Sequence, residues 1–189
     1  MAQQWTAGEL VELVHQYYPA NLNEEGFKSE QAQRLLALLA RIEIERAPLW
    51  NRFIERLRSH EPKSIVWDLS RPLNVQQCHR VRVYVPGTLM ARVDATAVMA
   101  CLSVMAPLYI VFTSYEHVEG DRTTTRVSYE PRPETIDLER MLERNIEETF
   151  GFTRLPNEVL FTPVPDLAPG NRLLGQATLA DCLFTDNRW

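Results

Sequence analysis

The run AVMACLSVM, residues 97–105, places apolar side chains at both odd and even positions. A strand with one face in water alternates apolar and polar residues, whereas a strand covered on both faces is apolar at both parities. The run therefore predicts a central strand of a sheet, with helices packed on at least one face of that sheet.

Further strands are expected on both sides of this run. Residues 65–69 and 80–85 alternate with the two-residue period of a strand. Residues 108–118 and 123–130 are two β-prone runs separated by the polar tip Glu119-Gly120-Asp121, which predicts a β-hairpin. We therefore expect a mainly antiparallel sheet of about four to five strands within residues 64–130.

The first sixty residues have helical signals. Thr6 followed three positions later by Glu9 is a capping box, so a helix is expected to begin there. Ser29 is a suitable N-cap for a second helix, whose apolar residues recur at helical spacing up to position 42. Because Pro48 lacks a backbone N–H, it either kinks this helix or stands in the first turn of a third helix, and we favour a break near Ala47.

The last third of the chain predicts one long helix and a tail. Thr135 is expected to cap a helix over residues 135–150, which Gly151 ends. Residues 156–189 contain too many prolines and glycines for long elements, so they are expected to form ordered coil with a short strand. Thr178 with Asp181 predicts one last helical turn within this coil.

These elements give an α+β fold in a single domain, 1–189. Its parts are a helical region (1–60), a sheet (64–130), a helix (135–150) and a coil with a short terminal helix (156–189). The hydrophobic fraction of 45% and the charged fraction of 24% in 189 residues are typical of one globular domain.

Composition and charge also limit the function. The opening MAQQWTAGEL does not resemble a secretory signal, and no stretch resembles a membrane span, so we expect a cytoplasmic protein. Cys78, Cys101 and Cys182 show no CxxC spacing, which argues against a disulfide framework and a zinc cage. A net charge of −5 disfavours nucleic acid and anionic lipid as partners. We expect no metal or cofactor, and the oligomeric state is left open.

The sequence lacks the common catalytic motifs: GxGxxG, GxxxxGK[ST], GxSxG and HExxH are all absent. Cys78 and His79 are adjacent, but neighbouring residues of a strand point to opposite faces and do not meet. By parity His79 joins the apolar face of its strand, where a core histidine is expected. A small enzyme with a site between sheet and helices, using His79, Asp68 or Cys101, is kept as an alternative.

An acidic stripe on the late helix is not explained by helix formation. Glu139, Glu143 and Glu147 stand four residues apart, and like charges at this spacing destabilise a helix. We predict a binding surface for a basic protein partner. The alternative is an ordinary solvated face, in which Arg140 and Arg144 offset part of the acidic charge.

A second candidate binding surface lies on one parity of the strand over residues 80–85. Arg80, Arg82 and Tyr84 share that parity, and arginine and tyrosine are frequent anchors of protein interfaces. The alternative is a strand face with solvated arginines that pair with Glu130 or Asp68.

The last stretch of the sequence, residues 163–189, reads PVPDLAPGNRLLGQATLADCLFTDNRW. This stretch resembles the tails of bacterial immunity proteins that accompany polymorphic toxins. The overall make-up, a small acidic α+β domain, is also similar to that of these proteins. The resemblance implies a non-catalytic protein-binding module that occludes a toxin, using acidic side chains if the toxin is basic, and it assigns no functional residues. A structural or adaptor subunit of a bacterial assembly is the remaining alternative.

Overall fold

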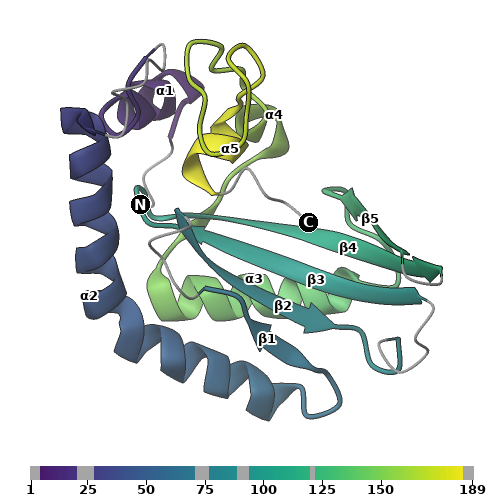
Figure 1. Cartoon of the computed structure of the whole chain (residues 1–189). Coiled ribbons are helices and arrows are strands. Elements are labelled where there is room, and N and C mark those ends of the chain that lie inside the picture. Colours follow the sequence, from purple (N-terminus) through teal and green to yellow (C-terminus); the bar gives the residue numbers. More distant parts are fainter. Residues whose placement is uncertain (1–4, 21–27, 71–76, 89–93, 120–121, 185–189) are drawn as a thin grey trace.

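The computed structural model describes residues 5–20, 28–70, 77–88, 94–119 and 122–184. Within these residues the chain forms five helices and a six-stranded, mostly antiparallel sheet, so the predicted α+β class is confirmed (Figure 1). The helices are α1 (Ala7–His15), α2 (Glu30–His60), α3 (Ile136–Phe150), α4 (Asn157–Leu160) and α5 (Leu179–Leu183). The strands are β1 (Val66–Asp68), β2 (Cys78–Tyr84), β3 (Asp94–Ser103), β4 (Leu108–Glu119), β5 (Arg122–Ser128) and β6 (Thr153–Arg154).

The sheet is an antiparallel meander in the order β1-β2-β3-β4-β5, and the two-residue β6 pairs in parallel with the start of β4. β3 is a central strand, as predicted, and every side chain from Ala97 to Ser103 is buried. The predicted hairpin is also confirmed, because β4 and β5 pair in one unbroken register that ends with Glu119 opposite Arg122. Gly120 and Asp121 lie outside the described residues.

Helices cover both faces of the sheet. The α2/α3 face presents Val81, Val98 and Val111 to the second half of α2 and to α3. The α1/α5 face presents Met99 and Phe112 to α1, α4, α5 and the coil that joins them. Figure 1 shows α3 on one side of the sheet and α1, α4 and α5 on the other. The strand that is apolar at both parities therefore has a hydrophobic partner on each side.

The break expected near Ala47 is wrong, because α2 is one helix of 31 residues with Pro48 inside it. Proline removes one backbone hydrogen bond of the helix. Core contacts hold the helix on both sides of that position: Ile42 packs with Val104, and Trp50 packs on the α2/α3 face. The helix therefore bends where a break was expected, and Figure 1 shows it curving past the sheet.

Over residues 156–184 the tail is coil that ends in the short helix α5, as expected for this part of the chain. A bridge joins Pro163 to Thr178, and the capping box of Thr178 and Asp181 begins α5. The Asp181 carboxylate accepts hydrogen bonds from the backbone N–H of Thr178 at 2.9 Å and from Arg172 Nε at 2.9 Å. The short helix α4 was not predicted. The predicted capping box of Thr6 and Glu9 is also present and begins α1.

His15 connects α1 to the tail. The ring donates from Nδ1 to the carbonyl of Val11 at 2.7 Å and from Nε2 to the carboxylate of Asp166 at 2.8 Å. Burial lowers the pKa of His15, but the bonds to Asp166 and Val11 outweigh that effect and raise it above the ordinary value of 6.5. The bond from His15 in turn lowers the pKa of Asp166 below 3.8.

We expect this contact to make stability depend on pH. The contribution of His15 is fully present below pH 6.5 and is lost as the pH rises through its raised folded pKa. The contribution of Asp166 is present above pH 3.8 and is lost as the pH falls through its lowered pKa. In urea unfolding, His15→Ala should therefore lose more stability relative to wild type at about pH 5.5 than at about pH 8.5. An equal loss at both pH values would contradict a charged His15.

Candidate functional site: protein-binding surfaces

The predicted acidic stripe on α3 begins at a buried residue. Glu139 is only 3% exposed, and its Oε1 accepts hydrogen bonds from Thr113 Oγ1 at 2.8 Å and Thr135 Oγ1 at 2.9 Å. Thr135 occupies the N-cap position of α3, but its hydroxyl bonds this carboxylate and makes no capping bond to the backbone. The polar groups of β4 and of the helix start thus satisfy Glu139 inside the protein.

The other two members of the stripe also have partners within the chain. Glu143 forms an ion pair with Arg154 of β6, and Tyr109 of β4 donates its hydroxyl to Glu147 at 2.7 Å. Burial, reinforced by Glu147, raises the pKa of Tyr109. Glu139 is thus buried, Glu143 is half-buried and Glu147 is exposed, so the expectation of an exposed acidic surface is contradicted at Glu139. The carboxylates of the stripe position α3 on β4 and β6.

We expect Glu139→Lys to destabilise the fold by about 3–5 kcal/mol, because it buries an ammonium next to hydroxyls and removes their acceptor. The matched control is Glu148→Lys on the same helix. Glu148 is half exposed and pairs with Arg56 at 2.5 Å, so the control should lose about 1 kcal/mol or less. Thermal unfolding followed by circular dichroism distinguishes the two, and comparable stability of both variants would show that Glu139 is not structural.

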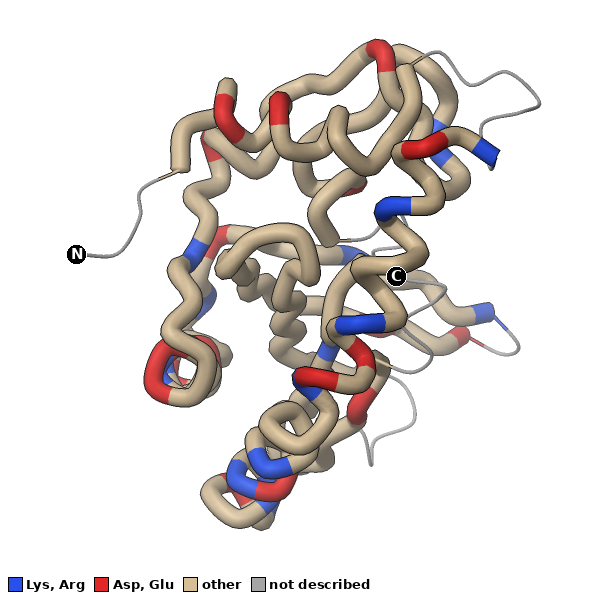
Figure 2. Tube along the Cα trace, turned by 90° about the vertical axis from the view of Figure 1, so that its left-hand side faces the viewer, with Lys and Arg blue, Asp and Glu red and all other residues tan. Residues whose placement is uncertain are grey.

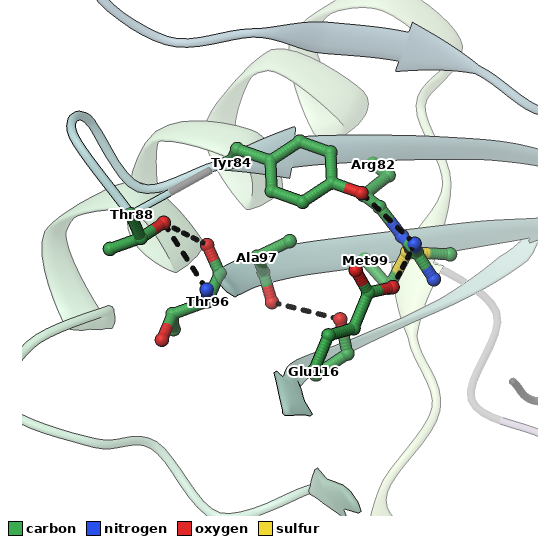
Figure 3. A network of polar contacts seen from close by, with 8 residues as sticks. Arg82, Tyr84, Thr88, Thr96, Ala97, Met99 and Glu116 are labelled. Carbon is green, nitrogen blue, oxygen red and sulfur yellow. Dashed lines mark hydrogen bonds and ion pairs between the residues drawn. The ribbon is translucent and has the colours of Figure 1, made fainter. Parts of the chain in front are cut away.

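The second predicted surface, Arg80, Arg82 and Tyr84 of β2, lies on the α1/α5 face. Arg82 forms an ion pair with Glu116 of β4 and donates a hydrogen bond to the Tyr84 hydroxyl at 3.1 Å (Figure 3). Tyr84 is 2% exposed, and Arg80 is half-buried. The partner of Arg82 is thus neither Glu130 nor Asp68. Arg82 and Tyr84 are part of a cross-strand network on the sheet and are not exposed anchors.

Two residues of the enzyme alternative, His79 and Asp68, both contact Trp50, whereas Cys101 lies apart from them. His79 is buried and stacks on the Trp50 ring at 4.7 Å, and the Trp50 Nε1–H donates to Asp68 at 3.0 Å. The core-histidine interpretation of His79 therefore agrees with its position. Cys101 packs on the α1/α5 face, so the sheet separates it from His79. Burial raises the pKa of the Cys78 thiol well above its ordinary value, which keeps that thiol protonated.

The described residues contain no group of three or more His, Cys, Asp or Glu side chains placed to hold a metal ion. Among the helices of those same ranges, none combines the length and apolar character needed to cross a membrane.

The first half of α2 presents an exposed surface that the sequence analysis did not identify. Its outward side carries a row of uncharged positions, bordered by the exposed Arg34, Arg41, Glu43 and Glu45, and we call this row the outer α2 stripe: Gln33, Leu36, Ala37, Ala40, Ile44, Ala47, Pro48 and Asn51. Leu36 is 49% exposed and Ile44 is 78% exposed. The available signal was the spacing of Leu36, Ala40 and Ile44, which repeats every four residues opposite the buried Leu38 and Ile42.

The charged residues that the structure describes do not form a patch of one sign on this side of the molecule. Figure 2 shows positions of both signs interspersed along the chain on this side of the molecule. On α2 itself, Arg34 pairs with Glu30 and Arg41 pairs with Glu45, each one turn apart. The distinguishing feature of this side is therefore the uncharged stripe between these pairs.

No protein family, curated protein or solved structure matches this chain. Its function is therefore inferred from its own surfaces.

Proposed function

We propose that this chain is a non-catalytic protein-binding module that docks a helix of its partner on the outer α2 stripe. The supporting observation is the exposure of Leu36 and Ile44 on one side of one helix, in an uncharged row that the exposed Arg41 and Glu43 border. Large apolar side chains grouped on a protein surface are typical of sites where another protein binds. The proposal covers the binding activity and leaves the partner's identity to experiment.

The shape of the stripe favours a helix as the docking element. Ala37, Ala40 and Ala47 leave shallow positions beside the bulkier Leu36 and Ile44. Side chains of a second helix fit into such positions when helices pack ridge into groove. The stripe thus offers both the apolar area and the alternation of large and small side chains that a partner helix needs.

The stripe is also held in a fixed position. On the opposite side of the same helix, Leu38, Leu39 and Ile42 are buried against Val104. Near the bend, Arg46 donates a hydrogen bond to the Ser103 carbonyl at 3.0 Å. A partner that binds here would not have to order the helix first, and this lowers the entropy cost of association.

The biological setting we propose is that of a bacterial immunity protein, which works in the cytoplasm and neutralises a toxin by covering its functional surface. The support is the resemblance of residues 163–189 to the tails of such proteins and the surface described above. In this setting few anchoring residues would hold the complex, and the surrounding charges would speed the encounter. An adaptor subunit of an assembly would use the same stripe with a permanent partner.

The stripe can be tested with Leu36→Glu/Ile44→Glu. The test partner is a toxin encoded by a gene next to the gene of this chain. Each anchoring residue of an interface contributes about 2 kcal/mol, so the double variant should bind this toxin at least about thirtyfold more weakly. Cells that express this toxin should lose their protection. Both positions are exposed, so circular dichroism and thermal unfolding should be unchanged.

The matched control is Arg52→Glu, an exposed position further along the same helix, which should bind and protect like the wild type. A photo-crosslinker at position 44 should form an adduct with the toxin, whereas one at position 52 should not. Full protection by Leu36→Glu/Ile44→Glu would contradict the proposal. An adduct between two copies of this chain would contradict it as well, because the stripe would then be a self-interface.

A further inference from the structure

β5 is an open edge of the sheet. Among the described residues it pairs only with β4, and its seven residues make no backbone hydrogen bond to any other described segment. The strand reads RTTTRVS, contains no proline and keeps its register without a bulge. Proteins commonly protect such edges with bulges, prolines or a covering segment, because the outward backbone groups can pair with another strand. In Figure 1, β5 forms the end of the sheet opposite β1.

The two faces of β5 differ in chemistry. Arg122 and Arg126 are exposed on the α2/α3 side, where Glu119 of β4 stands opposite Arg122 in the register, and neither arginine forms an ion pair with another described residue. On the α1/α5 side, the half-buried Val127 is followed by Tyr129, whose ring contacts that of Phe161 edge-on at 5.0 Å. Phe161 is 39% exposed. The edge therefore has a cationic row on one face and an apolar corner on the other.

A hollow of about 330 Å³ lies beside Arg126, and its lining includes Arg126, His117, Asp94 and Glu116. Both acids of this lining have partners: His117 Nδ1 bonds Asp94 at 2.6 Å, and Glu116 forms an ion pair with Arg82. The carboxylates around the hollow are thus engaged with other groups. The guanidinium of Arg126 can donate hydrogen bonds to a carboxylate of another protein.

We propose that the edge of β5 takes up an extended segment of a partner protein as an additional strand, and that this segment alternates acidic and apolar residues. Successive side chains of a strand point to opposite faces. The acidic ones would lie beside Arg122 and Arg126, and the apolar ones beside Val127 and Phe161. Strand addition of this kind is a known mode of peptide recognition. This surface is separate from the outer α2 stripe and does not depend on it.

One antiparallel register with a second copy of the chain is disfavoured by charge. In antiparallel pairing of β5 with its own copy, centred on Thr124, Arg122 of one chain would stand opposite Arg126 of the other. Like charges directly opposite each other destabilise a strand pair. The charge of the edge therefore favours an acidic partner strand.

The test uses the full chain and the labelled peptide acetyl-EVEVEV-amide, with fluorescence anisotropy as the readout. The peptide should bind, and Arg122→Glu/Arg126→Glu should weaken its affinity at least about tenfold, since two attractive contacts become repulsive. The matched control is Arg52→Glu/Arg144→Glu, which changes the net charge equally at exposed positions of α2 and α3 and should bind like the wild type.

Hydrogen exchange separates strand addition from simple charge attraction. At saturation the peptide should slow exchange of the outward amides of β5 at least about tenfold, because these amides gain acceptors. Exchange in β1 should be unaffected. Binding without this protection would overturn the proposal.

Three other results would also overturn it: no binding of the peptide at about 1 mM, equal binding of acetyl-KVKVKV-amide, or equal binding of a six-nucleotide oligothymidylate that depends on the same arginines. The last result would identify a surface for nucleic acid. The Leu36→Glu/Ile44→Glu variant should bind the peptide normally, so failure at one surface is distinguishable from failure at the other.

Discussion

Burial of β3 on both faces is the constraint on which the rest of the structure depends. A strand that is apolar at both parities needs a hydrophobic layer on each side. Trp50 of α2 and Leu142 of α3 supply one layer, and Leu10 of α1 and Leu183 of α5 supply the other. The Pro-rich tail therefore has a structural role, since without it part of β3 and β4 would be exposed to water.

The sequence predicts best where a signal is complete within a few residues. The capping boxes that begin at Thr6 and Thr178 involve only neighbours three positions away, and both are present in the structure. The hairpin of β4 and β5 needs only a short polar tip between two β-prone runs. The break expected at Pro48 failed because the decisive contacts are tertiary: core packing on both sides of Pro48 outweighs the loss of one backbone hydrogen bond.

The acidic residues of α3 show a second limit of sequence reasoning. Their spacing correctly indicates that something other than helix formation accounts for them. It does not indicate whether that partner is another protein or another part of the same chain. Here Thr113 and Tyr109 of β4 supply contacts from 26 and 38 residues away, and Arg154 of β6 supplies one from 11 residues away. To predict these contacts, one must know how α3 is rotated about its own axis. The apolar stripe of the helix determines that rotation only coarsely.

The sheet and the helical layers do not cover each other completely. The two proposed surfaces lie where one extends beyond the other. The tail contacts β4 near Leu108, Ile110 and Phe112, whereas β4 continues to Glu119 and pairs there with the exposed β5. On the opposite side of the molecule, the first half of α2 extends past the sheet (Figure 1). Each surface thus belongs to an element anchored in the core at another point, so binding would need little ordering. A helix groove and a strand edge select different partner elements, so one partner that engages both must contribute a helix and an extended segment.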